Sequence, residues 1–320
     1  MNIFKFEPIY KERIWGGTKI RDSFHRSGIN GENIGESWDV VDREEDNSIL
    51  ANTSFRGKTL SDLLRSEGKT VMGPHWNEGY RFPLLVKWLD CAERLSLQVH
   101  PPKNVAERLN GEPKTENWYV AEASEEAGLF IGLVKGTEPE AFLQAIQDGK
   151  AETFCHRTES QKGDSVLVES GRLHAIDGGN LILEIQQNSD TTYRVFDWKR
   201  LGLDGRPRSL HVEESMKCID FDDCEPELIS TNTQKGIEVI AESDHFRIKK
   251  VNIHSNDSIV FKEINSDPLL IHLLEGRLQV NHEFLSKGEH ALCPFSSSCS
   301  VTSNEDCSFL VTDRFSGHAH

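Results

Sequence analysis

The sequence lacks the features of an exported or membrane-spanning chain. No apolar run in its 320 residues approaches the roughly 20 needed to cross a bilayer. Its first residues alternate apolar and charged side chains, where a signal peptide would have a continuous apolar segment. We therefore expect a cytoplasmic protein that has no membrane partner.

Positive charge is also scarce. Lys and Arg number 36 against 52 Asp and Glu, so the formal net charge is -16. Nucleic acids and anionic membrane surfaces would both repel such a chain. We expect no nucleic-acid partner, and no pattern in the sequence indicates an obligate protein partner. At roughly 100–200 residues per domain, the length predicts two domains.

Motifs that would define several common sites are absent. The seven cysteines are odd in number and form no C-x-x-C pair, so we expect reduced thiols that pack as small apolar groups. The sequence contains no G-x-S-x-G, H-E-x-x-H or G-x-G-x-x-G motif. The chemistry must therefore come from residues that are scattered along the chain.

Short β-rich runs broken by Gly, Pro, Asn and Asp dominate the sequence and predict a mainly β fold. Helical spacing occurs at Thr59–Ser66, Pro139–Gln147 and Val212–Ile219, and in the second of these Thr137 is the expected N-cap and Gly149 the stop. The predicted strands are Ser48–Leu50, Leu84–Leu89, Leu95–His100, Trp118–Glu122, Leu129–Leu133, Ser165–Glu169, Leu181–Gln187, Ile248–Ile253, Leu269–Leu274 and Ala291–Pro294.

An internal repeat indicates how the strands are arranged. Gly163–His174 has two glycines eight residues apart and a His three residues further on, and Gly288–Cys299 follows the same register with Cys in place of the His. Both segments resemble the second motif of the cupin superfamily, in which the His binds a metal. The resemblance implies two cupin-like jelly-roll barrels with a few peripheral helices. Acidic Asp220–Glu227 then marks the boundary between a metal-binding domain at 1–228 and a degenerate, metal-free domain at 229–320.

One strand carries candidate metal ligands. Side chains alternate along a strand, so Ser96, Gln98 and His100 share one face. Gln98 and His100 together with Glu116 and His174 offer two nitrogens and two oxygens, a set that suits Zn²⁺ and also Mn²⁺, Co²⁺ or Ni²⁺. The alternative is that the two histidines are unrelated core residues bonded to backbone carbonyls.

A third block lies after the repeat. Glu184 alternates within an apolar strand, where a solvated carboxylate is unexpected, and the chain then enters a polar loop that ends at Arg194.

Together these runs resemble the type I phosphomannose isomerase family, in its short bacterial form. The matching segments keep a consistent order from about residue 13 to the region of His211, and they are Arg13–Gly17, Ile34–Trp38, Arg81–Lys87, Leu95–Pro101, Lys114–Tyr119, His174–Ile176 and Glu184–Trp198.

The resemblance implies that mannose 6-phosphate and fructose 6-phosphate are interconverted with one bound zinc per chain. It also implies roles for individual residues. The metal ligands are Gln98, His100, Glu116 and His174; the catalytic residues are Arg194, Glu184 and Lys114; Lys87 and Ser96 lie near the substrate.

The reaction moves a carbonyl between two carbons and passes through an enediolate. Positive charge from a metal and from Arg194 would stabilise its oxygens. Three candidates could move the proton: Glu184 if burial raises its pKa, Lys114 if neighbouring cations lower its pKa, and a hydroxide held by the metal. Two other functions remain open: a non-catalytic cupin that binds a sugar or sugar phosphate, and an Fe²⁺-dependent cupin oxidoreductase.

Overall fold

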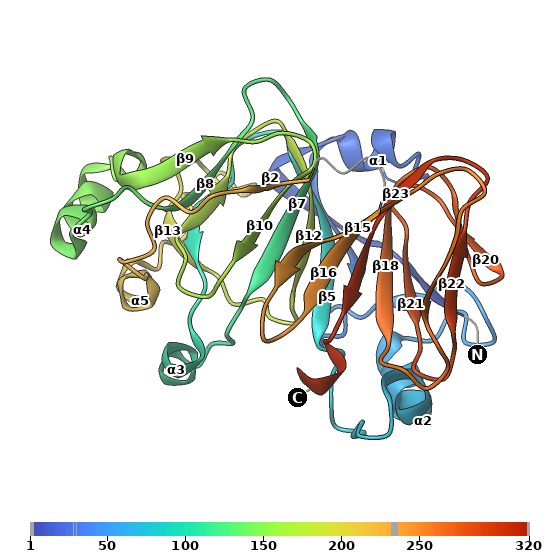
Figure 1. Cartoon of the computed structure of the whole chain (residues 1–320). Coiled ribbons are helices and arrows are strands. Elements are labelled where there is room, and N and C mark those ends of the chain that lie inside the picture. Colours follow the sequence, from blue (N-terminus) through green and yellow to red (C-terminus); the bar gives the residue numbers. More distant parts are fainter. Residues whose placement is uncertain (1–2, 28, 30, 232–235, 319–320) are drawn as a thin grey trace. The chain divides into compact units, whose positions relative to one another are not determined.

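The computed structural model describes residues 3–27, 29, 31–231 and 236–318. It is mainly β with few helices, which confirms the predicted fold class (Figure 1). The described residues form two compact units. Unit 1 contains those within Met1–Ile9, Ser37–Lys87 and Thr231–His320, and unit 2 contains those within Tyr10–Glu36 and Trp88–Ser230. None of the helices in the described ranges has the length and apolar character that a membrane crossing requires.

Two antiparallel sheets build unit 2. The first runs in the order β14 (Ile229–Ser230), β10 (Asp164–Val168), β7 (Glu116–Ala123), β12 (Asn180–Gln187), β5 (Leu84–Cys91), β3 (Ile34–Val40) and β2 (Ile9–Gly17). Strands β5, β3 and β2 also carry residues of unit 1. The second runs in the order β13 (Tyr193–Phe196), β6 (Leu97–Val99), β11 (His174–Ile176), β8 (Gly128–Leu133) and β9 (Cys155–Glu159).

The core of unit 2 follows from the alternation of side chains along these strands. Leu129 and Ile131 of β8 pack in one apolar cluster with Trp118 of the first sheet. Phe130 points the other way and packs with Phe142 of a helix. The second sheet therefore has one face inside the barrel and one face under helices.

Short helices cover the outer face of that second sheet. Figure 1 shows α4 and α5 beyond β9 and β13. The helical elements of unit 2 are α1 (Lys19–Ser23), α3 (Lys103–Ala106), η1 (Glu107–Leu109), α4 (Pro139–Asp148), η2 (Ala151–Phe154) and α5 (Val212–Cys218).

Unit 1 repeats the two-sheet plan. One sheet has the order β15 (Gly236–Glu242), β16 (Arg247–Ile253), β23 (Cys307–Asp313), β18 (Leu269–Glu275), β21 (His290–Cys293), β1 (Phe4–Glu7) and β4 (Ile49–Leu50). The other has the order β17 (Ser258–Lys262), β22 (Cys299–Thr302), β19 (Leu278–Val280) and β20 (Glu283–Leu285). Residues of both sheets share one buried cluster. The helical elements are α2 (Leu60–Met72) and η3 (Ser316–His318).

The N-terminal strand belongs to the same sheet as the C-terminal strands. β1 pairs with β21 through Phe4 and Leu292, and it pairs with β4 through Phe6 and Leu50. The sequence predicts a domain boundary near residue 228, and the last segment of unit 1 begins at Thr231. Residues before 88 that the sequence assigns to the metal-binding domain are nevertheless divided between the two units.

The three predicted helices are present, with one error at a cap. α4 ends at Gly149 in the left-handed conformation, as expected (φ 73°). Its N-cap, however, is Glu138 and not Thr137. The hydroxyl of Thr137 donates instead to the Val134 carbonyl at 2.7 Å. This bond closes the preceding turn and leaves the hydroxyl away from the helix N-terminus.

The cysteines form no disulfide, as the sequence predicts. All seven are free thiols, and six of them are buried. Burial raises the pKa of Cys155 to about 12, so this thiol stays protonated and packs as an apolar group.

Candidate metal centre and active site

Strand pairing in unit 2 brings the candidate ligands together. Gln98 on β6 lies opposite His174 on β11 and opposite Arg194 on β13. Glu116 begins β7 in the facing sheet, and His100 directly follows the end of β6. Four segments that are far apart in the sequence therefore converge inside one barrel.

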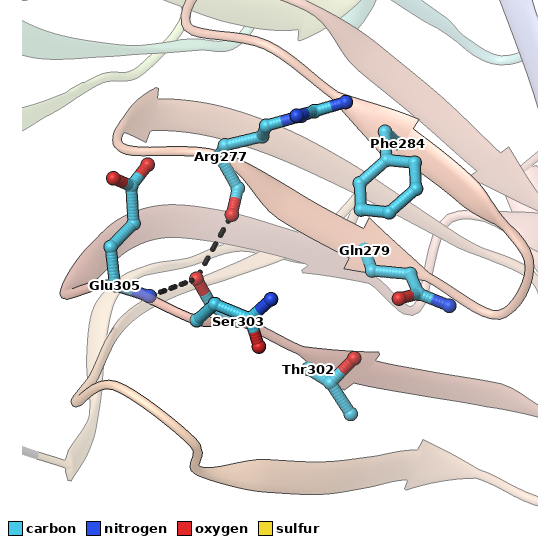
Figure 2. A pocket seen from close by; sticks show the side chains of 7 residues that line it. Arg277, Gln279, Phe284, Thr302, Ser303 and Glu305 are labelled. Atoms are coloured by element: carbon cyan, nitrogen blue, oxygen red, sulfur yellow. Dashed lines mark hydrogen bonds between the residues drawn. The ribbon is translucent and has the colours of Figure 1, made fainter.

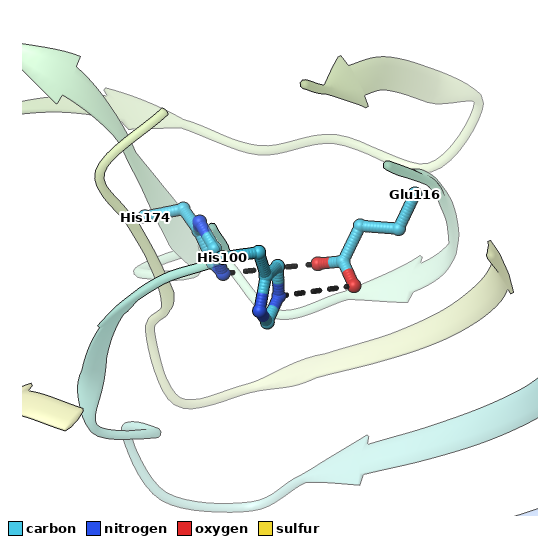
Figure 3. Close-up of side chains that lie close together, drawn as sticks. All are labelled: His100, Glu116 and His174. Atoms are coloured by element: carbon cyan, nitrogen blue, oxygen red, sulfur yellow. Dashed lines mark ion pairs between the residues drawn. The ribbon is translucent and has the colours of Figure 1, made fainter. Parts of the chain in front are cut away.

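Three of these side chains form a compact buried group (Figure 3). The Nε2 atom of His100 lies 3.3 Å from Oε2 of Glu116, and Nε2 of His174 lies 3.8 Å from Oε1 of the same carboxylate. The three ligand atoms all lie within 4.8 Å of one another. Each side chain is at most 2% exposed. Such a group can bind a metal ion.

Backbone carbonyls fix both imidazoles in the tautomer that a metal requires. Nδ1 of His100 donates to the carbonyl of Thr191 at 3.0 Å, and Nδ1 of His174 donates to the carbonyl of Arg172 at 2.8 Å. Because a carbonyl only accepts, Nε2 of each neutral ring carries the lone pair. Neither Nε2 atom has a hydrogen-bond partner among the described residues. Both histidines thus bond to backbone carbonyls, as the alternative interpretation proposed, but they are parts of one site.

The electrostatics favour ligands in their metal-binding states. Burial lowers the pKa of His100 to about 4, and it also lowers the pKa of His174. Burial alone would raise the pKa of Glu116, but the charge of Lys114 and the nearby imidazoles hold it well below its usual range. Neutral imidazoles and an ionised carboxylate are the forms that bind a divalent cation.

Gln98 and Ser96 form a hydrogen-bonded pair next to the metal-binding group. Nε2 of Gln98 donates to Oγ of Ser96 at 2.9 Å. This bond uses the amide nitrogen and orients the side chain, so the amide oxygen is available as a ligand. Ser96 itself is buried, at 1% exposure. The alternation that predicts a polar face on this strand therefore leads to two side chains that position each other.

Lys114 is placed beside the metal-binding carboxylate. Its Nζ lies 2.7 Å from Oε2 of Glu116, and its side chain is buried. Burial acts to lower the pKa of this ammonium, but the carboxylates of Glu116 and Glu184 outweigh burial and raise it. One hypothesis from the sequence was that neighbouring cations lower the pKa of Lys114. The direction is the opposite, because the charges that dominate around Lys114 are negative.

Glu184 accepts a hydrogen bond from Trp118, an aromatic residue that the sequence patterns did not assign to the site. The indole N–H of Trp118 donates to Oε2 of Glu184 at 3.1 Å, and the two residues are register partners on β7 and β12. The Trp118 ring also contacts the His174 ring edge to face, at 5.3 Å between centroids. Trp118 stands two residues after Glu116 and so shares its strand face, a spacing that could have marked it as part of the site.

Arg194 has a cluster of charged neighbours. Its Nη1 donates to the Ser209 carbonyl at 2.8 Å, and its Nε has no hydrogen-bond partner among the described residues. Arg200 and Arg208 both bind the single carboxylate of Asp197. Burial lowers the pKa of Arg194, and the charge of Arg208 lowers it further. An arginine remains charged at neutral pH despite such a shift.

Lys87 belongs to unit 1, whereas the metal-binding group belongs to unit 2. Its side chain is buried, and its Nζ lies 4.9 Å from the centroid of the Trp38 ring. The substrate-binding role of Lys87 therefore stays a prediction.

The fold and the site define a cupin-like β protein with a buried group that can bind a metal. The family model "Phosphomannose isomerase type I, catalytic domain" matches residues 3–137. A Bacillus subtilis protein named probable mannose-6-phosphate isomerase GmuF is 39% identical over 253 residues, which cover 77% of this chain and 78% of that protein. Mannose-6-phosphate isomerase ManA of the same species is 34% identical over 300 residues, 91% of this chain and 92% of that protein.

A solved structure agrees over nearly the whole chain. The crystal structure of mannose 6-phosphate isomerase from Bacillus subtilis has a TM-score of 0.86 and 32% sequence identity, and the match covers 98% of this chain and 99% of that chain. The chain belongs to the type I phosphomannose isomerase family.

Proposed function

We propose that this chain is a metal-dependent aldose–ketose isomerase that interconverts mannose 6-phosphate and fructose 6-phosphate. Its curated relatives carry the name mannose-6-phosphate isomerase. The observation that carries the proposal is the convergence of His100, Glu116 and His174 in a barrel of this family, with the ammonium of Lys114 at the same carboxylate. A protein that only bound sugars would not need a buried ammonium beside its metal ligands.

The resident metal is proposed to be one Zn²⁺, held by His100, Glu116 and His174 with the amide oxygen of Gln98 as fourth ligand. The two Nε2 atoms without hydrogen-bond partners support this assignment, and so does the use of the Gln98 nitrogen on Ser96. Nitrogen and oxygen donors of this kind suit zinc. When bound, such an ion supplies positive charge that stabilises negative charge on sugar oxygens.

Arg194 is proposed to stabilise the same negative charge on the sugar oxygens through its guanidinium. Its position opposite Gln98 places its backbone next to a proposed ligand. The bond to the Ser209 carbonyl holds Nη1, so the remaining N–H groups of the guanidinium are available to sugar oxygens. The single carboxylate of Asp197 already pairs with Arg200 and Arg208, so it does not neutralise Arg194 as well. This excess of positive charge favours an anionic substrate.

The two side-chain candidates for proton transfer are proposed to divide the work. Lys114 has a raised pKa, so it stays an ammonium that can donate a hydrogen bond or a proton to a sugar oxygen. Glu184 is a buried carboxylate that the Trp118 indole orients, and it is the candidate proton acceptor. A positioned acid or base of this kind contributes roughly 10²–10⁴-fold in rate.

Ser96 and Lys87 complete the proposal at the substrate. The Ser96 hydroxyl accepts from Gln98, so its own hydrogen remains for a substrate oxygen. Lys87 is kept as a proposed substrate-binding residue, as the family resemblance implies. We also propose a cytoplasmic location, which the seven free thiols support because reducing compartments keep thiols unpaired.

A coupled assay of mannose 6-phosphate turnover tests the function. Treatment with a chelator should abolish turnover, and added Zn²⁺ should restore it. Arg194→Ala should lower turnover at least about 100-fold, while Arg108→Ala, which removes an exposed arginine from η1, should not change it. Metal-replete protein without turnover would refute the proposal, and a sugar phosphate bound without reaction would favour the non-catalytic cupin. Oxygen uptake with iron would favour the oxidoreductase.

A further inference from the structure

A row of outward-facing side chains crosses the four-stranded sheet of unit 1. Gln279 on β19 is the register partner of Phe284 on β20 and of Thr302 on β22. The neighbouring residues Leu278 and Val301 are fully buried in the core of the unit. Because side chains alternate across a strand, Phe284, Gln279 and Thr302 stand in line on the outer face. Phe284 is 47% exposed, so part of its ring is open to solvent.

This row forms one wall of a pocket of about 270 Å³. The turn after β22 supplies the opposite wall through Asn304 and Glu305. Figure 2 shows Phe284 and Gln279 on one side of the pocket and Glu305 on the other. The hydroxyl of Ser303 fixes the turn, because it donates to the Arg277 carbonyl at 2.9 Å and accepts the Glu305 N–H at 3.2 Å. The pocket is therefore shaped by hydrogen bonds and does not depend on a ligand.

The pocket presents charged groups that have no ionic partner. The guanidinium of Arg277 lies over the Phe284 ring, 4.4 Å from its centroid. Within the described parts of the chain, neither this guanidinium nor the Glu305 carboxylate forms a salt bridge. Stacking holds the guanidinium flat and leaves its N–H groups directed along its own plane. The pocket thus offers donors from Arg277, acceptors from Glu305, and groups of both kinds from Gln279 and Asn304.

We propose that this pocket binds a neutral polyhydroxylated ligand, namely a hexose or the terminal ring of an oligosaccharide. Each sugar hydroxyl both donates and accepts, which matches a wall of guanidinium, carboxylate and amide groups. The Phe284 ring offers an apolar surface to the C–H groups of a sugar. The charges of Arg277 and Glu305 cancel, and the protein carries -16 overall, so an anionic ligand gains nothing here. The pocket volume of about 270 Å³ lies just below the roughly 300–1,000 Å³ of pockets that bind drug-sized ligands, so it suits a single sugar ring.

The site is separate from the metal centre in the sequence and in the units of the fold. Its residues belong to unit 1, and the metal-binding residues belong to unit 2. Saturation-transfer NMR and calorimetry with D-mannose and D-glucose test it, on the metal-loaded protein in the presence of saturating mannose 6-phosphate at equilibrium with its product. Both sugars should bind. Phe284→Ala and Gln279→Ala should each weaken binding about tenfold, and isomerase turnover should stay unchanged.

Val260→Ala is the matched control. Val260 is an exposed apolar residue of the same sheet, 59% exposed and outside the pocket lining. This variant should bind both sugars like the wild type. The proposal is overturned if phosphorylated sugar displaces the neutral ones, if neither pocket variant weakens binding, or if glucuronate or glycine binds better than mannose. None of these results bears on the isomerase assay, so the two proposals fail independently.

Discussion

The two histidines of the proposed metal centre are held as neutral imidazoles by the folded protein itself. Carbonyls of Thr191 and Arg172 hold the protons on Nδ1, and burial disfavours the charged ring. In water an imidazole with a pKa near 6.5 would compete for protons just below neutral pH. In the folded protein, protons compete with a metal for these nitrogens only at lower pH, because burial disfavours the doubly protonated ring.

Metal affinity should therefore depend weakly on pH between 7 and 5. The pKa of His100 in the folded protein is depressed to about 4, so a proton displaces the metal only as the pH falls toward that value. Equilibrium dialysis of Zn²⁺ against a chelator of known affinity at each pH measures this. A fall of tenfold or more between pH 7 and 6 would show that the imidazoles titrate like exposed ones.

Replacing Lys114 should separate metal binding from catalysis. In Lys114→Met the ammonium that contacts Glu116 is gone, so repulsion toward a divalent cation falls. We expect Zn²⁺ binding to be kept or strengthened while turnover falls about 10²–10⁴-fold. Lys103→Met, which changes an exposed lysine, is the control. Loss of Zn²⁺ binding in Lys114→Met would mean that this lysine mainly supports the ligand geometry.

Local pattern was sufficient to predict the polar strand but not its neighbours. The alternation of Ser96, Gln98 and His100 is a two-residue period that any strand must express. The contact between Lys114 and Glu116 lies within one short segment, but Glu184, which also raises the pKa of Lys114, comes from another strand. Sequence patterns identify the residues of such a site better than they identify the net charge around each of them.

The start of helix α2 is explained by its local sequence. Thr59 accepts the Asp62 N–H at 3.1 Å, and Asp62 accepts the Thr59 N–H at 3.3 Å, which forms a capping box. The predicted start at Thr59 is correct to one residue, and the predicted end at Ser66 lies directly before a kink at Glu67 (φ -127°, ψ 16°), beyond which the helix continues to Met72. Buried Val71 and Met72 extend the helix, and their burial depends on packing that the sequence does not display.

Removing this cap should destabilise the protein measurably. Thr59→Ala loses the bond from the Asp62 N–H to the Thr59 hydroxyl, keeps the bond from its own backbone N–H to Asp62, and should lower the free energy of unfolding by about 1 kcal/mol. Thr59→Ser keeps the hydroxyl and should be close to the wild type. Urea denaturation followed by circular dichroism compares the three proteins. Equal stability of the Ala and Ser variants would show that the first turn is held by packing alone.

The whole chain is organised by pairings that join distant segments. β1 lies between β21 and β4, and its pairing with β21 joins Phe4 to Leu292. No periodicity in either segment specifies this partner, because the same alternation would suit any free strand edge. The sequence therefore predicted the mainly β, cupin-like fold but not the return of the N-terminus to the C-terminal sheet.

Deleting the first eight residues should expose the edge of β21. We expect the amide of Leu292, which is paired with Phe4 of β1, to exchange with deuterium faster than in the full chain. Glu7→Ala, which changes an exposed β1 side chain and keeps the backbone ladder, is the control. Unchanged protection after the deletion would mean that β1 adds little to the stability of this sheet.

Anomalous diffraction at the zinc edge from crystals of the metal-loaded protein tests the central claim most directly. We predict one strong peak per chain, within bonding distance of Nε2 of His100, Nε2 of His174 and the carboxylate of Glu116. The amide oxygen of Gln98 should complete the ligand set. Loss of the peak in His174→Ala crystals would identify the ligand. A peak bound elsewhere on the chain, or full turnover by protein whose crystals give no peak at these three side chains, would contradict the account.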